Sequence, residues 1–383
     1  MIQLMENIVN KRKVYENLLS EFATKSDEAI YLKEKVNSKD ETRLSFNHDT
    51  DKILYSSSYA RYSGKTQVHT ASGNDMISTR ATHVQYVAHI ARNIARSLNL
   101  NEDLCEAMAL GHDLGHTPFG HVGEKILNKI SIEKLGIAFN HNIQSVRTLM
   151  YIENKGRGLN ISLQVLDGIM CHNGELLLNE YKPKNKDIDM FLNEFNNSYT
   201  DDKVIKKMIP MTLEGCVVRV SDIIAYLGKD IEDAIRLNKF SLNNLNVEIK
   251  EKLGSTNSQI ISTIILDIIN NSYEKGYIKM SDEIFNLVRK TLSLNYENIY
   301  SLAESENSRK VYELMFYQLY DVYLHAIKDK KLNNDIYIDF LNDKCDEYNI
   351  NTKDEVKVID FLAGMTDKYF LSEYHKYSKF NKK

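Results

Sequence analysis

Three features of the sequence predict an all-α protein. The chain of 383 residues contains only three prolines and 16 glycines, so few positions interrupt a helix. Apolar residues recur three and four positions apart over several long segments, which is the spacing of a buried helical face. The hydrophobic content of 43% is enough for a sizeable core. We therefore expect a helical core with additional helices towards the C-terminus.

The composition narrows the class of protein and its expected surroundings. The formal net charge of -4 is not that of a generic nucleic-acid binder, so groups that bind phosphate should gather in a pocket. The four cysteines are scattered without a CxxC spacing, which argues against a zinc knuckle or a disulfide framework. No apolar run has the length of a signal peptide core or of a membrane span. These observations predict a cytoplasmic protein with buried, reduced thiols.

The chain divides into three expected parts. Residues 1–40 are polar and charged with some helical spacing, which predicts an N-terminal helical and partly flexible extension. Residues 41–240 carry the polar motifs and form the expected core. Residues 241–383 contain further apolar helices, with a wide apolar face at 260–269, and are expected to pack on the core as a single structural unit. A polar run at residues 181–206 is interpreted as a surface insertion.

Two predicted helices near the start of the core end in ligand-type residues. An apolar stripe over residues 84–98 predicts a helix with His83 beside its N-terminal end and Arg80 one turn earlier. A second apolar helix over residues 104–113 ends in His112 and Asp113. Burying that carboxylate without compensation costs several kcal/mol, and a divalent cation would compensate it. A buried Asp–His hydrogen bond is the plainer alternative.

The segment after Asp113 contains glycines and a proline that interrupt the helix. It is therefore predicted to be a loop that presents His116 and His121, with the helix resuming at about residue 123. Glu124 follows His121 by three positions, so its carboxylate can orient the imidazole, as in a general acid or base. Further along the chain, His172 is as readily a structural histidine as a site residue.

Ligand-facing residues are also predicted at both ends of the core. A long helix over residues 212–235 places Asp222, Tyr226 and Asp230 four positions apart and hence on one face. Upstream, Arg61, Lys65 and Gln67 are candidates to face a ligand.

The candidate ligands His83, His112-Asp113 and Asp222 supply two imidazoles and two carboxylates. This set without thiolate favours Mn²⁺, Mg²⁺, Fe²⁺ or Ni²⁺ over structural zinc. Their order along the chain resembles that of the HD-domain metal-dependent phosphohydrolases. The resemblance implies an HD-domain helical core with one divalent metal ion per site, Mn²⁺ or Mg²⁺ first and Fe²⁺, Ni²⁺ or Co²⁺ as alternatives.

Further motifs narrow the resemblance to the dGTPase-type deoxynucleoside triphosphate triphosphohydrolases. In family order they are RLSFNHDTDKILYSSSYARYSGKTQVH (43–69), TRATH (79–83), GHDLGHTPFGHVGE (111–124), FNHN (139–142), SDIIAYLGKDIEDA (221–234) and DFLAGMTDKYF (360–370). The chain departs from the family pattern at Ala60, Tyr62, Ser63 and Asn140, which leaves the base preference open.

The resemblance implies a role for each site residue. His121 and Glu124 would carry out the proton chemistry. Arg80, His116 and His141 would contact phosphate or nucleotide, and Gln67, Tyr226 and Asp230 would contact the deoxyribose. A tyrosine against the sugar leaves little room for a 2′-hydroxyl, which favours deoxynucleotides.

The implied activity is hydrolysis of dGTP or other dNTPs to deoxynucleoside and inorganic triphosphate, which would control dNTP pools. Two alternatives remain open: an HD-type nucleotidase or phosphodiesterase, and a catalytically silent regulator that senses nucleotides or binds nucleic acid. The expected partners are the dNTP substrate and further copies of the chain in a hexamer or tetramer, because relatives form symmetric assemblies. A nucleotide activator is left open, and neither a membrane nor nucleic acid is indicated.

Overall fold

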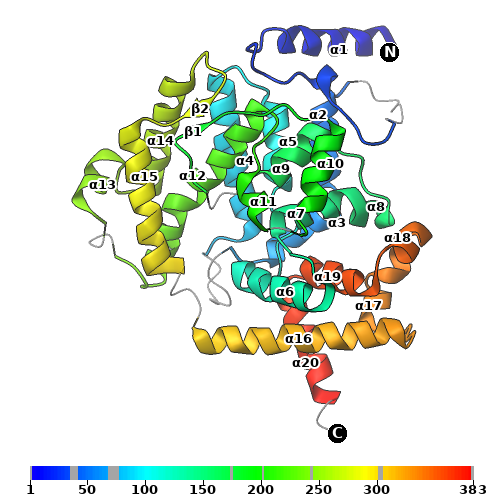
Figure 1. The fold of residues 1–383 in the computed structure, drawn as a ribbon. Coiled ribbons are helices and arrows are strands. Elements are labelled where there is room, and N and C mark those ends of the chain that lie inside the picture. The colour runs from blue at the N-terminus through cyan, green and yellow to red at the C-terminus, as the bar shows by residue number, and fades with distance from the viewer. Residues whose placement is uncertain are drawn as a thin grey trace.

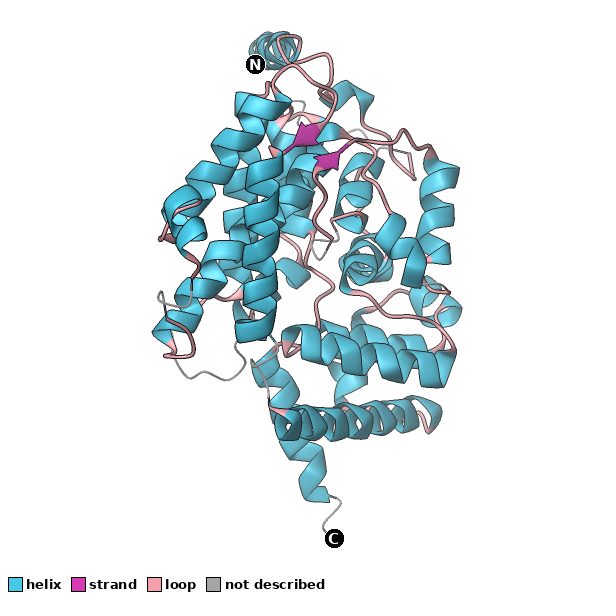
Figure 2. Ribbon diagram, turned by 60° about the vertical axis from the view of Figure 1, so that its left-hand side comes forward, coloured by secondary structure: helices cyan, strands magenta, loops and turns pink. Residues whose placement is uncertain are grey.

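The prediction of an all-α fold is confirmed. The computed structural model describes residues 2–34, 42–67, 77–172, 176–200, 202–241, 245–300 and 305–380. In these ranges the only strands form one short antiparallel pair, β1 (Glu180–Tyr181) with β2 (Ile278–Lys279), at one end of the helical bundle (Figure 2). None of the described helices is long and apolar enough to cross a membrane.

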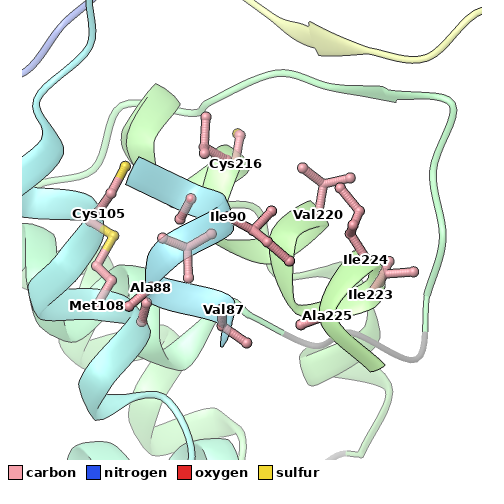
Figure 3. Close-up of a cluster of buried hydrophobic side chains, with 14 of the residues drawn as sticks. Val87, Ala88, Ile90, Cys105, Met108, Cys216, Val220, Ile223, Ile224 and Ala225 are labelled. Carbon is pink, nitrogen blue, oxygen red and sulfur yellow. The ribbon is translucent and has the colours of Figure 1, made fainter. Parts of the chain in front are cut away.

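Three helices form the centre of the molecule: α4 (Arg80–Ser97), α5 (Glu102–Gly111) and α12 (Leu213–Arg236). Val87, Met108 and Val220 are fully buried where these helices meet, as the close-up in Figure 3 shows. The hydroxyl groups of Thr79 and Thr212 cap α4 and α12 by accepting hydrogen bonds from backbone N–H groups of their first turns. The ends of α4 and α5 and the middle of α12 are thereby fixed relative to one another, and these places carry the predicted metal ligands.

Further helices surround this centre. Helices α2 (Ser45–Leu54) and α9 (Leu163–Met170) pack on α5, and α7 (His141–Arg147) packs on α9. Helices α14 (Asn257–Ser272) and α15 (Asp282–Asn295) pack on α12. The apolar face predicted at 260–269 is turned to this centre, because Ile260, Ile264 and Ile268 are buried.

The helices that form a second hydrophobic cluster lie below the three central helices in Figure 1. It joins α6 (Gly120–Leu135), α16 (Glu306–Lys328), α19 (Asp354–Gly364) and α20 (Asp367–Phe380). Helix α16 runs along α6, and α20 leads away from it to the C-terminus (Figure 1). The C-terminal helices therefore reach the predicted site through α6, which carries His121 and Glu124.

The N-terminal segment is anchored to the far end of the central helices. Helix α1 (Ile2–Glu16) lies there, and the Glu16 carboxylate accepts hydrogen bonds from Ser26 and, at 3.2 Å, from the Asn101 side chain. The flexible end expected for this extension falls partly on residues 35–41, which lie outside the described residues.

The interpretation of residues 181–206 as a surface insertion is wrong. Helix α10 (Ile188–Asn197) buries Phe191 and Phe195 against α9, and the aromatic spacing of four residues provides that inner face. Lys186 is also buried, with its Nζ atom 2.6 Å from carboxylate oxygens of both Asp167 and Glu194. The polar composition led to the wrong interpretation because only one face of α10 is apolar.

Short helices connect these elements. They are η1 (Ser26–Glu28), α3 (Ser57–Ala60), η2 (Arg61–Gly64), η3 (Thr148–Ile152), α8 (Glu153–Gly156), α11 (Asp202–Lys207), α13 (Val247–Lys252), η5 (Tyr296–Tyr300), α17 (Asp335–Ile338), η6 (Leu341–Asp343) and α18 (Asp346–Asn351). All four cysteines are free, and three are buried as predicted, whereas Cys345 is partly exposed.

Candidate metal centre and substrate pocket

The predicted site residues meet in one cavity of about 880 Å³. Helices α4, α6 and α12 supply many of its lining residues, and α15, η5 and α16 supply others. Four of the residues predicted to face a ligand are not in the lining: Arg61, Lys65, His112 and Glu124. Of these, His112 and Glu124 directly contact residues that are. The volume lies in the range of pockets that bind small-molecule ligands.

The four predicted metal ligands come together at the floor of this cavity. The His83 Nε2 atom lies 3.0 Å from Asp222 Oδ1, and the His112 Nε2 atom lies 3.5 Å from Asp113 Oδ1 and 3.7 Å from Asp222 Oδ1. Helix α5 ends at Gly111, so His112 and Asp113 follow the helix. The prediction that they are its last two residues is wrong. All four side chains are buried.

The environment of His112 fits a metal ligand. Its Nδ1 atom lies 2.7 Å from the carbonyl oxygen of Ala109, which can only accept, so Nδ1 carries the proton and Nε2 has the lone pair. That Nε2 atom is buried, and it has no hydrogen-bond partner in the part of the chain that the structure describes. A buried lone pair beside two carboxylates is satisfied by a divalent cation, so the donor set fits one.

The two carboxylates of the floor favour the ionised form. Burial alone would raise the pKa of Asp113, but the neighbouring His112 and Arg80 hold it well below its usual value. Burial is likewise outweighed at Asp222, where the hydrogen bond with His83 lowers the pKa. Arg80 forms an ion pair with Asp113 Oδ2 and is itself buried, while its Nε atom has no hydrogen-bond partner within the described ranges. The guanidinium is thus held against the floor of the cavity.

His121 and Glu124 lie close together on α6, with Nδ1 3.3 Å from Oε2. Helix α6 begins at Gly120, so His121 belongs to its first turn, and the prediction that His121 lies on the loop is wrong. The turn is possible because Phe119 adopts a left-handed conformation with φ of 61°. The His121 side chain is 53% exposed and projects into the cavity, whereas Glu124 is largely covered.

Glu124 also orients His141. The His141 Nδ1 and backbone N atoms lie 2.7 and 2.8 Å from Glu124 Oε1. Burial alone would lower the pKa of His141, but Glu124 raises it to about 9. Burial would raise the pKa of Glu124, yet the two imidazoles keep it well below its usual value. One ionised carboxylate therefore fixes two histidines of the cavity.

His116 is buried and stacks on His141, with ring centroids 4.3 Å apart. Burial, followed by the charges of Arg80 and His141, lowers the pKa of His116 well below its usual value, so it is neutral at pH 7. The prediction that Lys65 faces a ligand is wrong: its Nζ atom donates to the backbone oxygens of His116 and Ala363. Lys65 therefore stabilises the loop that contains His116.

Arg61 is also absent from the lining of this cavity. It donates to Ser58 and lines a separate cavity of about 390 Å³ between α3 and the C-terminal helices, so the prediction that it faces this ligand is not supported. Gln67 does line the main cavity, with a buried Oε1 atom that has no hydrogen-bond partner among the described residues. The motif that contains it continues into residues 68–76, which lie outside the described residues.

The three predicted positions on α12 all line the cavity. Asp230 is buried and accepts a hydrogen bond of 2.6 Å from the hydroxyl group of Tyr300. Burial raises the pKa of Asp230 to about 6, although this hydrogen bond opposes the rise. Sequence reasoning missed Tyr300, because its segment shows no motif and reaches α12 only through the packing of α15.

Sequence reasoning also left His172 undecided, and the structure places it in the cavity lining. Its Nε2 atom lies 3.9 Å from Asp113 Oδ1 and 3.2 Å from His141 Nε2. Like His112, it follows the end of an apolar helix and directs Nδ1 to the carbonyl oxygen three residues earlier, here Ile169 at 2.6 Å. That shared local pattern is the signal that could have identified it.

Basic side chains line the outer part of the cavity. Lys125 and Lys129 from α6 and Arg309 from α16 are part of its lining, as is Glu313, which lies 2.5 Å from Lys129. This concentration of positive charge suits a polyanionic ligand in a chain of negative net charge.

Comparison with known proteins gives consistent matches over most of the chain. Residues 80–227 match the HD domain, and residues 278–376 match the phosphohydrolase-associated domain. The chain is 37% identical to a deoxyguanosinetriphosphate triphosphohydrolase-like protein of Caldanaerobacter subterraneus, over 93% of this chain and 91% of the relative. It is 34% identical to a protein of the same description from Clostridium perfringens strain 13, over 98% and 97% of the two chains.

Proposed function

The chain belongs to the family of deoxyguanosinetriphosphate triphosphohydrolase-like proteins, and on that premise we propose that it is a metal-dependent dNTP triphosphohydrolase. The family supports phosphohydrolase chemistry. The proposal adds the substrate, dGTP or another dNTP, and the products, a deoxynucleoside and inorganic triphosphate. Such an activity would control dNTP pools.

One observation carries the proposal: the Nε2 atom of His112 is buried, has no hydrogen-bond partner among the described residues, and lies 3.5 and 3.7 Å from carboxylate oxygens of Asp113 and Asp222, beside a cavity whose lining includes basic side chains. We assign His83, His112, Asp113 and Asp222 as the residues that would bind a divalent ion, Mn²⁺ or Mg²⁺ first. When bound, the ion would supply Lewis-acid polarisation of a phosphate oxygen. Arg80 keeps Asp113 ionised and oriented.

His121 is the proposed catalytic acid or base. In the reaction a water oxygen bonds to the α-phosphorus, and the bond from that phosphorus to the 5′-oxygen breaks. The leaving 5′-oxygen needs a proton, and the attacking water must lose one. His121 projects into the cavity and is oriented by Glu124, so it is suited to transfer one of these protons.

The remaining residues are proposed to bind the substrate. His116 and His141 would contact phosphate together with Arg80, and Gln67 would contact the deoxyribose through its buried amide group. Tyr226 and Asp230 would bind the sugar, and the Tyr300 hydroxyl group fixes the Asp230 carboxylate. A sugar that packs on Tyr226 has little space for a 2′-hydroxyl, which favours deoxynucleotides.

Product analysis tests this proposal. The purified chain is incubated with each dNTP and Mn²⁺, and triphosphate, pyrophosphate and phosphate are separated. Triphosphate and deoxynucleoside are expected, with His121→Ala and Asp222→Ala inactive. His89→Ala is the matched control, because His89 is an exposed histidine on α4. Phosphate released from monophosphates alone would instead indicate a nucleotidase, and no turnover even with mixed dNTPs would indicate a nucleotide sensor.

The proposal extends to the state of the protein in the cell. We infer a homo-oligomer, a hexamer or tetramer, with a nucleotide activator to be tested by adding a second dNTP to each assay. A reducing cytoplasmic setting accords with four free cysteines. Mass measurement of the purified chain in solution tests the assembly.

A further inference from the structure

The second cavity, of about 390 Å³, is not used by the proposed function, although it borders the same loop as the main cavity. Leu114 and Gly115 line the second cavity, whereas Asp113 and His116 on either side of them line the main one. Four consecutive residues therefore belong to the walls of both cavities. A molecule bound in the second cavity would contact the segment that carries a proposed metal ligand.

Segments that the sequence singled out meet in this second cavity. Most residues from 360 to 366 line it, and none of them lines the main cavity. The N-terminal motif adds Ser57, Ser58 and Arg61, which are likewise absent from the main cavity. The main site therefore does not account for these parts of the motifs.

The acidic side chains that line the second cavity already have partners. Glu153 accepts hydrogen bonds from the backbone N–H and hydroxyl groups of both Ser57 and Ser58. The partners of the other carboxylates are Arg147 for Asp360, the Tyr369 hydroxyl group for Asp339 and Lys155 for Asp343. None of these carboxylates needs a cation from outside.

The two basic side chains of the lining lack such partners, because neither Arg61 nor Lys344 forms an ion pair with a described residue. Arg61 donates to the hydroxyl oxygens of Ser57 at 3.3 Å and Ser58 at 2.7 Å, and its buried Nε atom has no hydrogen-bond partner in the described ranges. Lys344 donates to the backbone oxygen of Ile152 at 3.0 Å. Burial lowers the pKa of both groups, and the charge of Glu153 does not fully offset it.

We propose that the second cavity binds a small phosphate-bearing anion through Arg61 and Lys344. A guanidinium group with an unused N–H suits a phosphate oxygen, and an ammonium group adds a second charged donor. Phe340, Phe361 and Met365 provide apolar surface for an organic part of the ligand. A cavity of about 390 Å³, against about 880 Å³ for the main one, suits a molecule with one phosphate group.

The same anion would change the affinity of the metal centre, an inference that rests on the proposed function. The Gly115 N–H donates to Ser145 Oγ at 2.8 Å, and that hydroxyl group donates to the backbone oxygen of His112 at 2.7 Å. A shift of Gly115 is therefore transmitted to a proposed metal ligand. By linkage, bound anion and bound metal then alter the affinity for each other by the same factor.

Calorimetric titration of the full-length, metal-free chain with inorganic phosphate and with a nucleoside monophosphate tests the site. Removal of metal excludes binding through the proposed metal centre. Arg61→Gln should weaken binding by about tenfold or more, because a hydrogen bond from a charged donor is lost. Gly364→Leu should prevent binding without removing a charge, because its side chain would extend into the cavity towards Arg61 Nη2, which lies 3.7 Å from the Cβ position.

The control is Arg289→Gln, which removes an exposed guanidinium group bonded to the Asn286 side chain. It should bind phosphate as the wild type does. No binding to the wild type, or undiminished binding to both Arg61→Gln and Gly364→Leu, would overturn the second site, because phosphate in the main cavity is unaffected by these two changes. If one of the two variants does not fold, the other decides.

Manganese titration with and without phosphate tests the effect on the metal centre, with free Mn²⁺ measured by electron paramagnetic resonance. Phosphate should change the dissociation constant of Mn²⁺ by about fivefold or more in the wild type and leave it unchanged in Arg61→Gln. Equal constants in the wild type would overturn this coupling. Absence of any Mn²⁺ binding would instead overturn the proposed function, while the phosphate titration still decides on the second cavity.

Discussion

Gly115 offers a sharp test of how the loop that follows Asp113 is held against α7. A Cβ atom at this position would lie 2.3 Å from the backbone nitrogen of Ser145 and 2.4 Å from the backbone oxygen of His141. Ordinary contact begins at 3.4 Å, so Gly115→Ala requires a displacement of about 1.1 Å, the difference between 3.4 and 2.3 Å. The neighbours are backbone atoms of a helix and cannot rotate away. Either α7, with His141, or the loop that follows Asp113 must move.

The expected cost has two parts. Overpacking of this kind lowers the free energy of unfolding by about 1–3 kcal/mol, and the hydrogen bond of 2.8 Å from Gly115 N to Ser145 Oγ is strained as well. A shift of about 1 Å in catalytic groups can reduce turnover by on the order of 10²-fold. Urea unfolding and dNTP hydrolysis measure the two effects.

Gly364→Ala is the matched control, because its Cβ atom would meet only Arg61 Nη2, at 3.7 Å. It should change the free energy of unfolding by less than about 0.5 kcal/mol. Wild-type stability together with wild-type turnover in Gly115→Ala would refute the packing argument. Lost turnover at unchanged stability would show that the loop moves without cost, which would contradict the rigid contact with α7.

Three further predictions follow from buried groups. Phe191→Ala should lower the free energy of unfolding, measured in urea, by about 3–5 kcal/mol. At the exposed neighbour, Met190→Ala should change it by less than about 0.5 kcal/mol. Equal effects of the two substitutions would contradict the burial of one face of α10. Free Mn²⁺ at about 100 times its dissociation constant should stabilise the wild type by about 2.7 kcal/mol or more in thermal unfolding, and Asp222→Asn should lose most of this gain; an unchanged gain argues against the ligand set. Because the folded pKa of Asp230 is about 6 and the ordinary value is 3.8, the folded state binds this proton more tightly, so the residue favours folding increasingly as pH falls through 6. The free energy of unfolding of Asp230→Asn minus that of the wild type should therefore be about 2 kcal/mol larger at about pH 7.5 than at about pH 4.5. A difference that stays constant across this range would exclude the pKa shift.

The parts of the site that sequence predicts best are those fixed by helical spacing. Asp222, Tyr226 and Asp230 share a face because they are four residues apart on one helix, and the structure has them on α12 along the cavity. The helix ends were less predictable. Helix α6 starts three residues before the predicted position, because Phe119 accepts a left-handed conformation that residue preferences disfavour.

Other parts depend on tertiary packing and leave no local trace. Tyr300 reaches Asp230 only because α15 packs on α12. Lys65 was predicted to face a ligand, yet its ammonium group donates hydrogen bonds to two backbone carbonyl oxygens. In both cases the partner that decides the role of the residue is distant in sequence. A local pattern of residue types does not identify such a partner.

The C-terminal motif at 360–370 illustrates how distant segments determine the site without lining it. None of its residues belongs to the main cavity. The Asp367 carboxylate accepts hydrogen bonds from the backbone N–H of Thr66 at 3.2 Å and of Phe119 at 3.0 Å. The backbone oxygen of Ala363 accepts from Lys65, which also binds the backbone of His116.

These bonds tie together the segment before Gln67 and the loop between His116 and His121. Both segments carry proposed substrate or catalytic contacts, but neither is a regular helix that could hold its own position. The motif therefore holds the two loops together, because the Asp367 carboxylate accepts hydrogen bonds from both of them. If Gln67 and His116 bind the substrate as proposed, a substitution at Asp367 should therefore weaken both contacts together and not one alone.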